Sequence, residues 1–309
     1  MILTLTINPA IDHNVMADRL VFEDRGYILS TSDSAGGRGI NASCVIHAFG
    51  GKTVAIAVSG GKSGARLERF LSGCGFPVEL APIANEVRTN LTITDRQGLT
   101  VKLNEVGPYI SAAELERLEA VVRQNLAGAG WLMLCGSVPP GVPPGFYSKL
   151  VKMAGEQHVK TLLDTDGPAL IEGMESGPTV VAPNQQEVER LLNTVLITRN
   201  HFLEAAARLR KMGPESVALS LGSRGAVGAF DDRLIEVIPP RVDTVCPIGA
   251  GDALAAALVW AMSQKGDFRD ALRWGVAAGT ASARLPGLTF ASLEQTKEIY
   301  QQVEVRNAR

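Results

Sequence analysis

The stretch CPIGAGDALAAALVWAM, residues 246–262, joins a glycine-rich turn to an apolar, helix-forming run. Such a junction is typical of an open α/β sheet, in which ligands bind outside the carboxyl ends of strands, where helices begin. Gly249 and Gly251 let backbone N–H groups approach a ligand closely, and the helix N-terminus adds a partial positive charge. The turn Gly249-Ala250-Gly251 is therefore expected to form an anion site.

Asp252 follows this turn directly. A bound phosphate would repel its carboxylate unless the carboxylate has a task there, and taking the proton from an attacking hydroxyl is such a task. The alternative is that Asp252 only caps the helix, because Asp is among the preferred N-cap residues. These residues alone leave both interpretations open.

Outward from this stretch, short β-branched runs alternate with longer helical patterns. Near-continuous apolar strands between helices indicate a parallel sheet covered on both faces, and hence a doubly wound α/β fold. The segment GAVGAFDDRLIEVI, residues 225–238, is hairpin-like, and two final helices are expected around 252–264 and 268–283.

Two segments, about 12–34 and 86–106, alternate polar and apolar residues instead, and a hairpin turn is expected near Arg96-Gln97-Gly98. Alternation predicts one buried and one exposed face, so these segments should form a small sheet that projects from the core, which we call the lid. Because the lid is inserted rather than appended, residues 1–309 are interpreted as a single domain.

Composition excludes several classes of protein. Of the 309 residues, 46% are hydrophobic and 20% charged, and the formal net charge of −2 argues against disorder and against a surface that binds nucleic acid. The longest apolar run, Ala253 to Met262, is about half of a membrane span, and the N-terminus lacks the basic region of a signal peptide. The four cysteines are scattered, without metal-type spacing. A cytoplasmic protein with reduced thiols is expected, without a nucleic-acid or membrane partner.

A second glycine-rich stretch, DSAGGRGINAS at 33–43, also precedes a helix and places Asn41 in its first turn. Residues 37–42 match the GxGxxA pattern of a dinucleotide site, but VSGG stands about 20 residues further on, where a ribose-binding acid is needed. A nicotinamide cofactor is therefore disfavoured. SGGKSG at 59–64 is no P-loop either, because Ile56 stands where that motif needs glycine.

With these two motifs in this order, the sequence resembles the ribokinase-like (PfkB) family of carbohydrate kinases along essentially its whole length. AGGRGIN (35–41) is similar to the first family signature and GAGDALAAAL (249–258) to the second. TLTINPAID (4–12), VRTNLTI (87–93) and KLNEVGP (102–108) resemble the branch that acts on phosphorylated sugars: 1-phosphofructokinase, tagatose-6-phosphate kinase and the minor 6-phosphofructokinase. The resemblance implies a ribokinase-like fold, a mostly parallel sheet flanked by helices, with an inserted β-sheet lid.

The resemblance also implies roles for the matched positions. Asp252 would be the catalytic base, and the amides of Gly249, Ala250 and Gly251 would hold the transferring phosphoryl group. The substrate would be bound by Asp12, Gly36, Gly37, Arg38, Asn41, Arg88, Lys102 and Ser137. Carboxylate and amide groups suit sugar hydroxyls, and an arginine fork suits a phosphate that the sugar already carries. For Arg88 and Lys102 the alternative is a solvated strand face.

The implied cofactors are ATP and Mg²⁺. The nucleotide would be bound by Ser220, Gly222, Ser223, Gly225 and Gly279. Asn184 and Glu187 would act on the metal indirectly, through water. The same two residues match a helix capping box, and both roles can hold at once.

Four positions depart from the family pattern. Arg38 stands where Lys is usual, Ala182 where Lys is frequent, and Cys246-Pro247 where a Ser-Thr pair is frequent. SGGKSG lacks an acid often found there. These differences put one nucleotide contact and one sugar contact in question, and they leave Asp252 in place.

The resemblance therefore implies a kinase that transfers the γ-phosphoryl group of ATP to a primary hydroxyl of a phosphorylated ketohexose. Fructose 1-phosphate, giving fructose 1,6-bisphosphate, is the first choice, and tagatose 6-phosphate and fructose 6-phosphate are the alternatives. Two further alternatives are a kinase of unphosphorylated sugars or nucleosides and a catalytically inactive sensor of sugar phosphates. If the outer face of the lid is apolar, a homodimer through the lid follows as a hypothesis.

Overall fold

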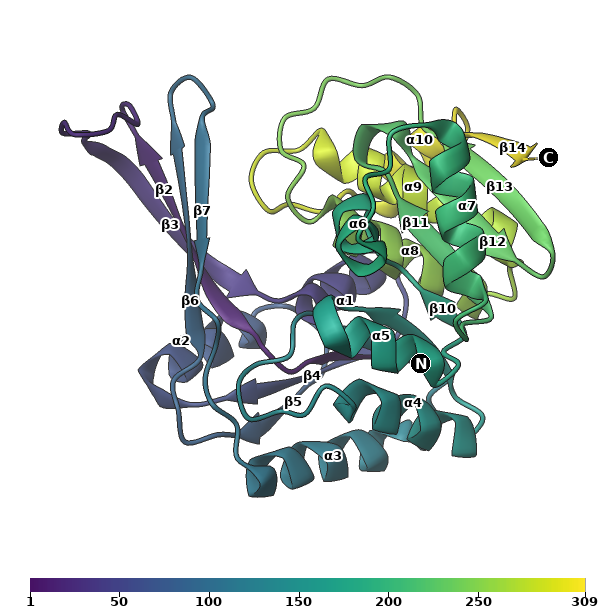
Figure 1. Ribbon diagram of the computed structural model, residues 1–309. Helices are drawn as coiled ribbons and strands as arrows, with labels where there is room; N and C mark the ends of the chain where they lie inside the picture. Colours follow the sequence, from purple (N-terminus) through teal and green to yellow (C-terminus); the bar gives the residue numbers. More distant parts are fainter. Residues whose placement is uncertain (309) are drawn as a thin grey trace.

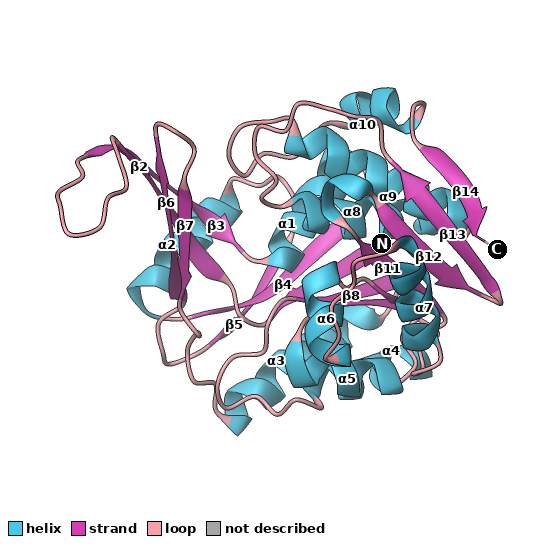
Figure 2. Cartoon of the chain, turned by 45° about the horizontal axis from the view of Figure 1, so that its top comes forward, coloured by secondary structure: helices cyan, strands magenta, loops and turns pink. Residues whose placement is uncertain are grey.

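A computed structural model describes residues 1–308. A ten-stranded sheet with helices on both faces forms the body, and a separate four-stranded sheet projects from it (Figure 1). Figure 2 shows the two sheets as distinct groups of strands. The expected doubly wound α/β fold with a small additional sheet is confirmed.

The strand order of the large sheet is β14-β13-β12-β11-β10-β9-β8-β1-β4-β5. Neighbouring strands from β5 to β11 pair in parallel, and β12, β13 and β14 extend the sheet with antiparallel pairs. Every residue of β1 is buried, because helices cover both faces of the sheet there. The strands are β1 (Ile2–Thr6), β4 (Thr53–Ser59), β5 (Val78–Pro82), β8 (Trp131–Cys135), β9 (Lys160–Asp164), β10 (Val180–Val181), β11 (Ser216–Ser220), β12 (Ala226–Phe230), β13 (Arg233–Ile238) and β14 (Glu304–Ala308).

Helices pack on both faces of the large sheet, and each face has its own cluster of buried hydrophobic side chains. One face carries α3 (Ala112–Leu126), α4 (Phe146–Glu156), α5 (Gly167–Glu175), α6 (Gln185–Leu192) and α7 (Arg199–Arg210). The other carries α1 (Arg38–Ala48), α8 (Ala250–Ser263), α9 (Phe268–Ala283) and α10 (Leu293–Tyr300), and α2 (Gly61–Ser72) packs beside α1. A short 3-10 turn (Gly222–Arg224) follows β11.

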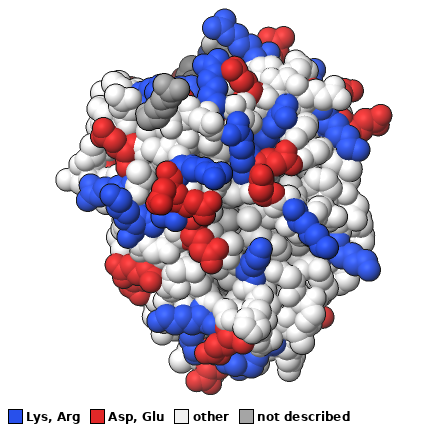
Figure 3. Space-filling view, turned by 90° about the vertical axis from the view of Figure 1, so that its right-hand side faces the viewer, with Lys and Arg blue, Asp and Glu red and all other residues white. Residues whose placement is uncertain are grey.

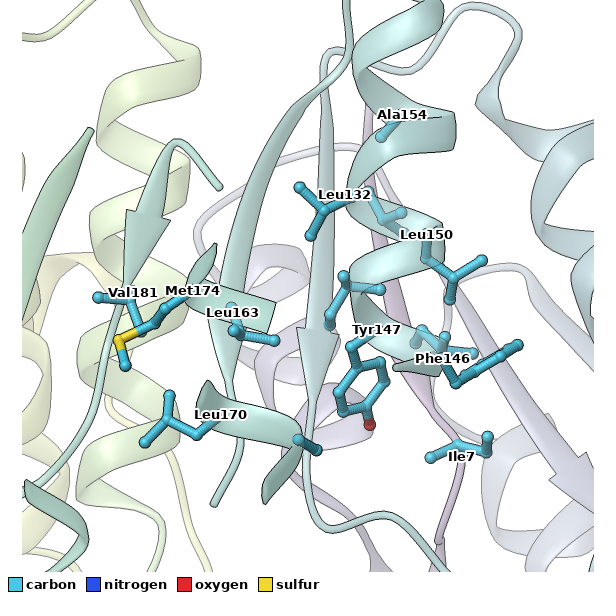
Figure 4. Packing of buried hydrophobic residues seen from close by; sticks show 14 of the residues in the cluster. Ile7, Leu132, Phe146, Tyr147, Leu150, Ala154, Leu163, Leu170, Met174 and Val181 are labelled. Atoms are coloured by element: carbon cyan, nitrogen blue, oxygen red, sulfur yellow. The ribbon is translucent and has the colours of Figure 1, made fainter. Parts of the chain in front are cut away.

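Helix α4 shows how the core is built. Tyr147 and Leu150 project from α4 onto Leu132 and Leu163 of the sheet (Figure 4), and all four are fully buried. Burying a side chain of this size contributes about 1.5–3 kcal/mol. The Tyr147 hydroxyl lies 3.1 Å from the carbonyl oxygens of Cys135 and Gly136, so its polar end is satisfied inside the core.

The lid consists of β2 (Ala10–Ala17), β3 (Ile28–Gly36), β6 (Arg88–Asp95) and β7 (Thr100–Asn104), in the order β3-β2-β6-β7. These strands lie where the alternating segments predict them. The turn at Arg96-Gln97-Gly98 is confirmed: Gly98 has φ +86°, and the Asp95 carboxylate accepts from the amides of Gln97 and Leu99. Because β2 follows β1 and α1 follows β3 directly, the lid is attached to the body at β1, the third strand from the β5 edge of the large sheet.

The C-terminal part differs from expectation. Helices α8 and α9 lie where two helices were expected, but they are not the last elements, because α10 and β14 follow them. Ser292 and Gln295 form a capping box that starts α10. Strand β14 has the polar sequence EVRNA and is held mainly by its pairing with β13. No local sequence pattern predicts that pairing.

On the face drawn in Figure 3, Lys and Arg side chains are interspersed with Asp and Glu, and neither sign forms a continuous stripe. This matches the small net charge of −2. Within residues 1–308, no helix combines the length and the apolar character that crossing a membrane requires.

Candidate active site

The two glycine-rich motifs meet at the carboxyl edge of the large sheet. The Asn41 amide on α1 donates to the Asp252 carboxylate on α8 over 2.7 Å, although the two residues are 211 positions apart in the sequence. Helix α8 begins at Ala250, its N-cap is Gly249, and no side chain caps it. The interpretation of Asp252 as the N-cap is therefore wrong, and its carboxylate is held by Asn41 instead.

The surroundings of Asp252 bring the pKa of its carboxyl group close to neutral pH. Burial raises its pKa to about 7, and the nearby Asp164 carboxylate adds to this, while the Asn41 hydrogen bond and the Arg38 charge oppose it. A base is most effective when its pKa lies near the working pH. The environment of Asp252 thus suits a group that takes up and releases a proton near neutrality.

The turn before Asp252 has the shape of an anion site. Gly249 has φ +80°, a backbone conformation that strains any residue with a Cβ, and a Cβ there would also lie 2.7 Å from Leu288 Cδ1, so this position favours glycine. The Ala250 amide donates to the Pro247 carbonyl over 3.2 Å. The Gly251 amide, in the first helical turn, has no intrahelical partner, which leaves it free for a ligand. Ala250 and Gly251 both line the adjoining cleft.

That cleft has a volume of about 660 Å³, and every residue expected to bind the nucleotide lines it. These residues are Ser220, Gly222, Ser223, Gly225 and Gly279. Sequence reasoning missed the opposite wall, which comes from the segment 239–247 between β13 and α8. The two prolines at 239 and 240 mark the end of β13, but they carry no signal for a ligand.

Asn184 and Glu187 form the expected capping box at the start of α6. The Asn184 side chain accepts from the Glu187 amide over 3.0 Å, and a Glu187 carboxylate oxygen accepts from the Asn184 amide over 2.8 Å. Burial raises the pKa of Glu187, against the charge of Arg38. Within residues 1–308, no three His, Cys, Asp or Glu side chains are grouped to hold a metal directly. The indirect metal role of Asn184 and Glu187 stays a prediction.

Arg38 lies among carboxylates at the rim of the sheet. Its guanidinium is 2.6 Å from Asp164 at the end of β9, 3.0 Å from Glu187 on α6 and 3.8 Å from Asp166. The charges of Asp164, Glu187 and Asp252, with Asp164 the largest, raise the pKa of Arg38, while burial opposes them. Arg38 was expected to bind substrate; in the structure its guanidinium pairs with Asp164 and Glu187, which ties the start of α1 to β9 and α6, and a contact with substrate stays a prediction.

On the lid side, Asp12 is the central acid. Asn90 on β6 donates to it over 2.9 Å, and a Cβ on Gly36 would lie 2.4 Å from an Asp12 carboxylate oxygen. Burial raises the pKa of Asp12, while the Asn90 hydrogen bond and the charges of Arg88 and Lys102 lower it. Lys102 is exposed on β7 opposite Thr92, and strand alternation puts it on the same face of the lid as Asp12.

Asn8, which sequence reasoning did not single out, connects the lid to the body. Its amide donates to the Ser137 hydroxyl over 3.1 Å and to the Val106 carbonyl over 3.0 Å. The backbone carbonyl of Asn8 accepts from the Arg88 guanidinium over 3.0 Å, and the backbone carbonyl of Glu105 accepts from it over 2.9 Å. The sequence did offer one signal for Asn8: it stands just after a buried strand, and ligands of open α/β sheets bind at the carboxyl ends of strands.

Unpartnered polar atoms gather around Asp12. In residues 1–308, seven buried side-chain polar atoms lack a hydrogen-bond partner, and four of them are Asn8 Oδ1, Ser34 Oγ, Arg88 Nε and Asn90 Oδ1. Ser34 pairs with Asp12 across β2 and β3. Because buried polar atoms are normally hydrogen-bonded, this concentration marks a place suited to a ligand rich in hydroxyl groups.

Comparison with known proteins agrees with this geometry. The family model "pfkB family carbohydrate kinase" matches residues 5–296. The chain is 29% identical over 308 residues to the 1-phosphofructokinase of Borreliella burgdorferi, with 99% of each chain covered. It is 30% identical over 302 residues to the ATP-dependent 6-phosphofructokinase isozyme 2 of Escherichia coli, with 97% of each covered.

Among solved structures, phosphofructokinase-2 from Escherichia coli in complex with substrates and products is similar with a TM-score of 0.89. The identity is 29%, and the match covers 97% of this chain and 98% of that one. Because the family model spans nearly the whole sequence, the chain belongs to the pfkB family of carbohydrate kinases.

Proposed function

We propose that this carbohydrate kinase transfers the γ-phosphoryl group of ATP to a primary hydroxyl of a phosphorylated ketohexose. Fructose 1-phosphate, giving fructose 1,6-bisphosphate, is the substrate that we favour. Relatives at similar identity are named for different acceptor sugars, 1-phosphofructokinase and 6-phosphofructokinase, so the choice of sugar rests on a direct assay.

The observation that carries the proposal is the set of unpartnered polar atoms around Asp12, next to two cationic side chains. Hydroxyl groups of a sugar supply the donors and acceptors that Asn8, Ser34 and Asn90 lack. Arg88 and Lys102 supply positive charge on the same side, which a phosphate already on the sugar would neutralise. A free sugar would leave those two charges unused.

In the proposed reaction, Asp252 takes the proton from the attacking hydroxyl while Asn41 fixes the direction of its carboxylate. The Gly251 amide, with the N-terminus of α8, stabilises charge on the transferring group. Asp12 and Asn90 hold the sugar, with Gly36 leaving room beside them. The lid covers the sugar and excludes water, which would otherwise compete as the acceptor.

The nucleotide would occupy the cleft lined by Ser220, Gly222, Ser223, Gly225 and Gly279. Mg²⁺ would neutralise charge on the ATP phosphates, held through its water shell by Asn184 and Glu187. The residues fit an indirect role, because both Glu187 carboxylate oxygens already accept hydrogen bonds from the protein. We place the reaction in the cytoplasm, where ATP and sugar phosphates are available.

The test is release of ADP with Mg-ATP and a panel of acceptors: fructose 1-phosphate, fructose 6-phosphate, tagatose 6-phosphate, fructose, ribose and adenosine. Turnover restricted to one phosphorylated ketohexose supports the proposal. Arg88→Ala and Lys102→Ala should each raise KM for that sugar about 10- to 100-fold, since hydrogen bonds to charged groups are worth about 1.5–3 kcal/mol. Arg96→Ala, in the exposed lid turn, is the control that should change nothing. Preference for a free sugar, with Arg88→Ala and Lys102→Ala fully active, contradicts the proposal.

We also propose a homodimer formed through the outer face of the lid. Strand register places Leu91 opposite Leu103 and Ile93 opposite Val101, on the face turned away from Asp12. Leu103 and Val101 are 57% and 39% exposed, so the edge strand β7 presents uncovered apolar side chains on this face. A second copy of the lid is an occupant of matching shape and chemistry.

A further inference from the structure

Two cysteines outside the candidate active site lie side by side. Cys44 is on α1, and Cys74 follows the last turn of α2. Both thiols are free and partly exposed, and Cys74 Sγ lies 3.5 Å from the Phe70 carbonyl oxygen on α2. The two thiols are near enough for each to shift the pKa of the other. Their separation in the sequence gave no sign of this, because they form neither a CxxC pair nor a metal-type spacing.

The packing around the two thiols supports their proximity independently, because Cys74 packs against the buried cluster that contains Ile40, one turn before Cys44 on α1. His47, one turn after Cys44 on α1, packs edge-on against Phe76, with ring centroids 5.7 Å apart. Its Nε2 atom lies 3.0 Å from the point where a Cβ on Gly75 would stand. The helix face that carries residues 44 and 47 therefore rests on the loop 74–76.

The two thiols are chemically different. The hydrogen bond from Cys44 lowers the pKa of Cys74 to about 7, and the same contact together with burial raises the pKa of Cys44. Near neutral pH, Cys74 is thus the thiol that ionises, and the thiolate is the nucleophile. Among residues 1–308, no third ligand joins the pair to make a metal site.

We propose that Cys44 and Cys74 are a site of reversible disulfide formation, with low-molecular-weight disulfides as the reactant. The Cys74 thiolate attacks one sulfur of the small disulfide, forms a mixed disulfide and expels a small thiolate. Cys44 then loses its proton to water and attacks the Cys74 sulfur, which expels the second small thiolate. Two protein thiols are oxidised, and one small disulfide is reduced to two thiols.

The bond would join α1 to the end of α2, the two helices on which the lid rests. The first turn of α1 carries Arg38 and Asn41, and Arg66 on α2 pairs with Asp33 of lid strand β3. Closing a loop of about 30 residues restricts the unfolded chain, so the thermal midpoint should rise by several degrees. A thiol reductant should reverse the rise.

A tryptic peptide map without reduction tests the proposal on the whole protein, whatever its substrate. Each cysteine falls in a different tryptic peptide: 39–52 for Cys44, 70–88 for Cys74, 124–149 for Cys135 and 242–265 for Cys246. After exposure to oxidised glutathione at pH 7, peptides 39–52 and 70–88 should be found joined. The other two peptides should not be joined to either.

Single variants separate the two steps. The reaction of the Cys44→Ser variant should stop at a mixed disulfide on Cys74. In the Cys74→Ser variant, Cys44 should react about tenfold more slowly than Cys74 does in the wild type, because a smaller fraction of Cys44 is thiolate. The proposal is overturned if the wild-type map shows only a stable mixed disulfide on Cys74, a link to Cys246, or no reaction at either thiol. The wild-type map decides the question even if a variant fails to fold.

Discussion

At the scale of single residues, the contact between Asn41 and Asp252 decides what Asp252 can do. Asp252→Asn keeps the size and the hydrogen-bonding capacity of the side chain but removes the proton acceptor. Folding should survive, because Gly249 and not Asp252 caps α8. Turnover should fall about 10²- to 10⁴-fold, the usual contribution of a general base. Steady-state ADP release measures it, and a variant as active as the wild type would remove Asp252 from the mechanism.

The same carboxylate should make stability depend on pH. The pKa of Asp252 is raised from 3.8 to about 7 on folding, so between these values the folded state holds a proton that the unfolded state has released. Stability from this group is therefore greatest at low pH and is lost as pH rises through about 7. Asp252→Asn should melt several degrees higher than the wild type at pH 8, and the difference should vanish near pH 4.

Scanning calorimetry at both pH values measures this difference. A melting difference that stays constant with pH would show that the Asp252 carboxylate is no more costly to ionise in the folded protein than in the unfolded chain.

Asn41 should set the pH at which the enzyme loses activity. Its hydrogen bond lowers the pKa of Asp252, so Asn41→Ala should raise that pKa above about 7. The acidic limb of the kcat/KM profile, which reports the base in the free enzyme, should then move to higher pH. A profile that only drops in height, with its limb unmoved, would mean that Asn41 binds sugar without tuning the base.

At the scale of elements, Arg38 connects three separate elements, α1, β9 and α6, through ion pairs. It starts α1 and pairs with Asp164 at the end of β9 and Glu187 on α6. Arg38→Met would leave those two buried carboxylates without their cation. Because the Arg38 side chain is 30% exposed and water can reach it, the loss should be about 1–3 kcal/mol in the free energy of unfolding. Arg38→Lys keeps the charge but not the fork, so its loss should be smaller. Urea unfolding ranks the three proteins, and equal stabilities would show that the cluster is solvated.

The elements also show which features a sequence reveals. The α6 capping box and the lid turn were predictable because their residues lie within a few positions of each other. The contacts between Arg38 and Asp164 and between Asn41 and Asp252 join residues 126 and 211 positions apart, and only the fold brings them together. Resemblance to a family supplied the shared site, but it gave no hint of the Cys44 and Cys74 pair or of β14, which depend on packing between distant segments.

At the scale of the whole molecule, the lid has two faces with different tasks. The inner face presents Asp12 and Asn90 to the candidate sugar site. The base of the outer face is covered by α2, where Ile11 packs with Leu67 and Leu71. Above this contact, Leu103 and Val101 on the edge strand β7 stay exposed, so an assembled form of the protein would bury them.

Dimerisation through this face gives a sharp prediction. The wild type should show twice the chain mass of 32.8 kDa in light scattering at micromolar concentration. Leu103→Glu places a charge within the proposed contact and should give the monomer mass, because an unpaired buried charge opposes association. Val195→Glu is the matched control. Val195 is 66% exposed and lies on the body, in the loop between α6 and α7, outside the lid. Its replacement should therefore leave the dimer intact.

The sugar kinetics should follow the same change. In the Leu103→Glu monomer the lid strands lose their support, so KM for the sugar phosphate should rise more than KM for ATP, whose cleft lies on the body. A wild type with the mass of one chain would refute the dimer. A Leu103→Glu protein that remains dimeric would instead place the contact elsewhere on the surface, and its unchanged KM values would then show that the lid keeps its shape without a partner.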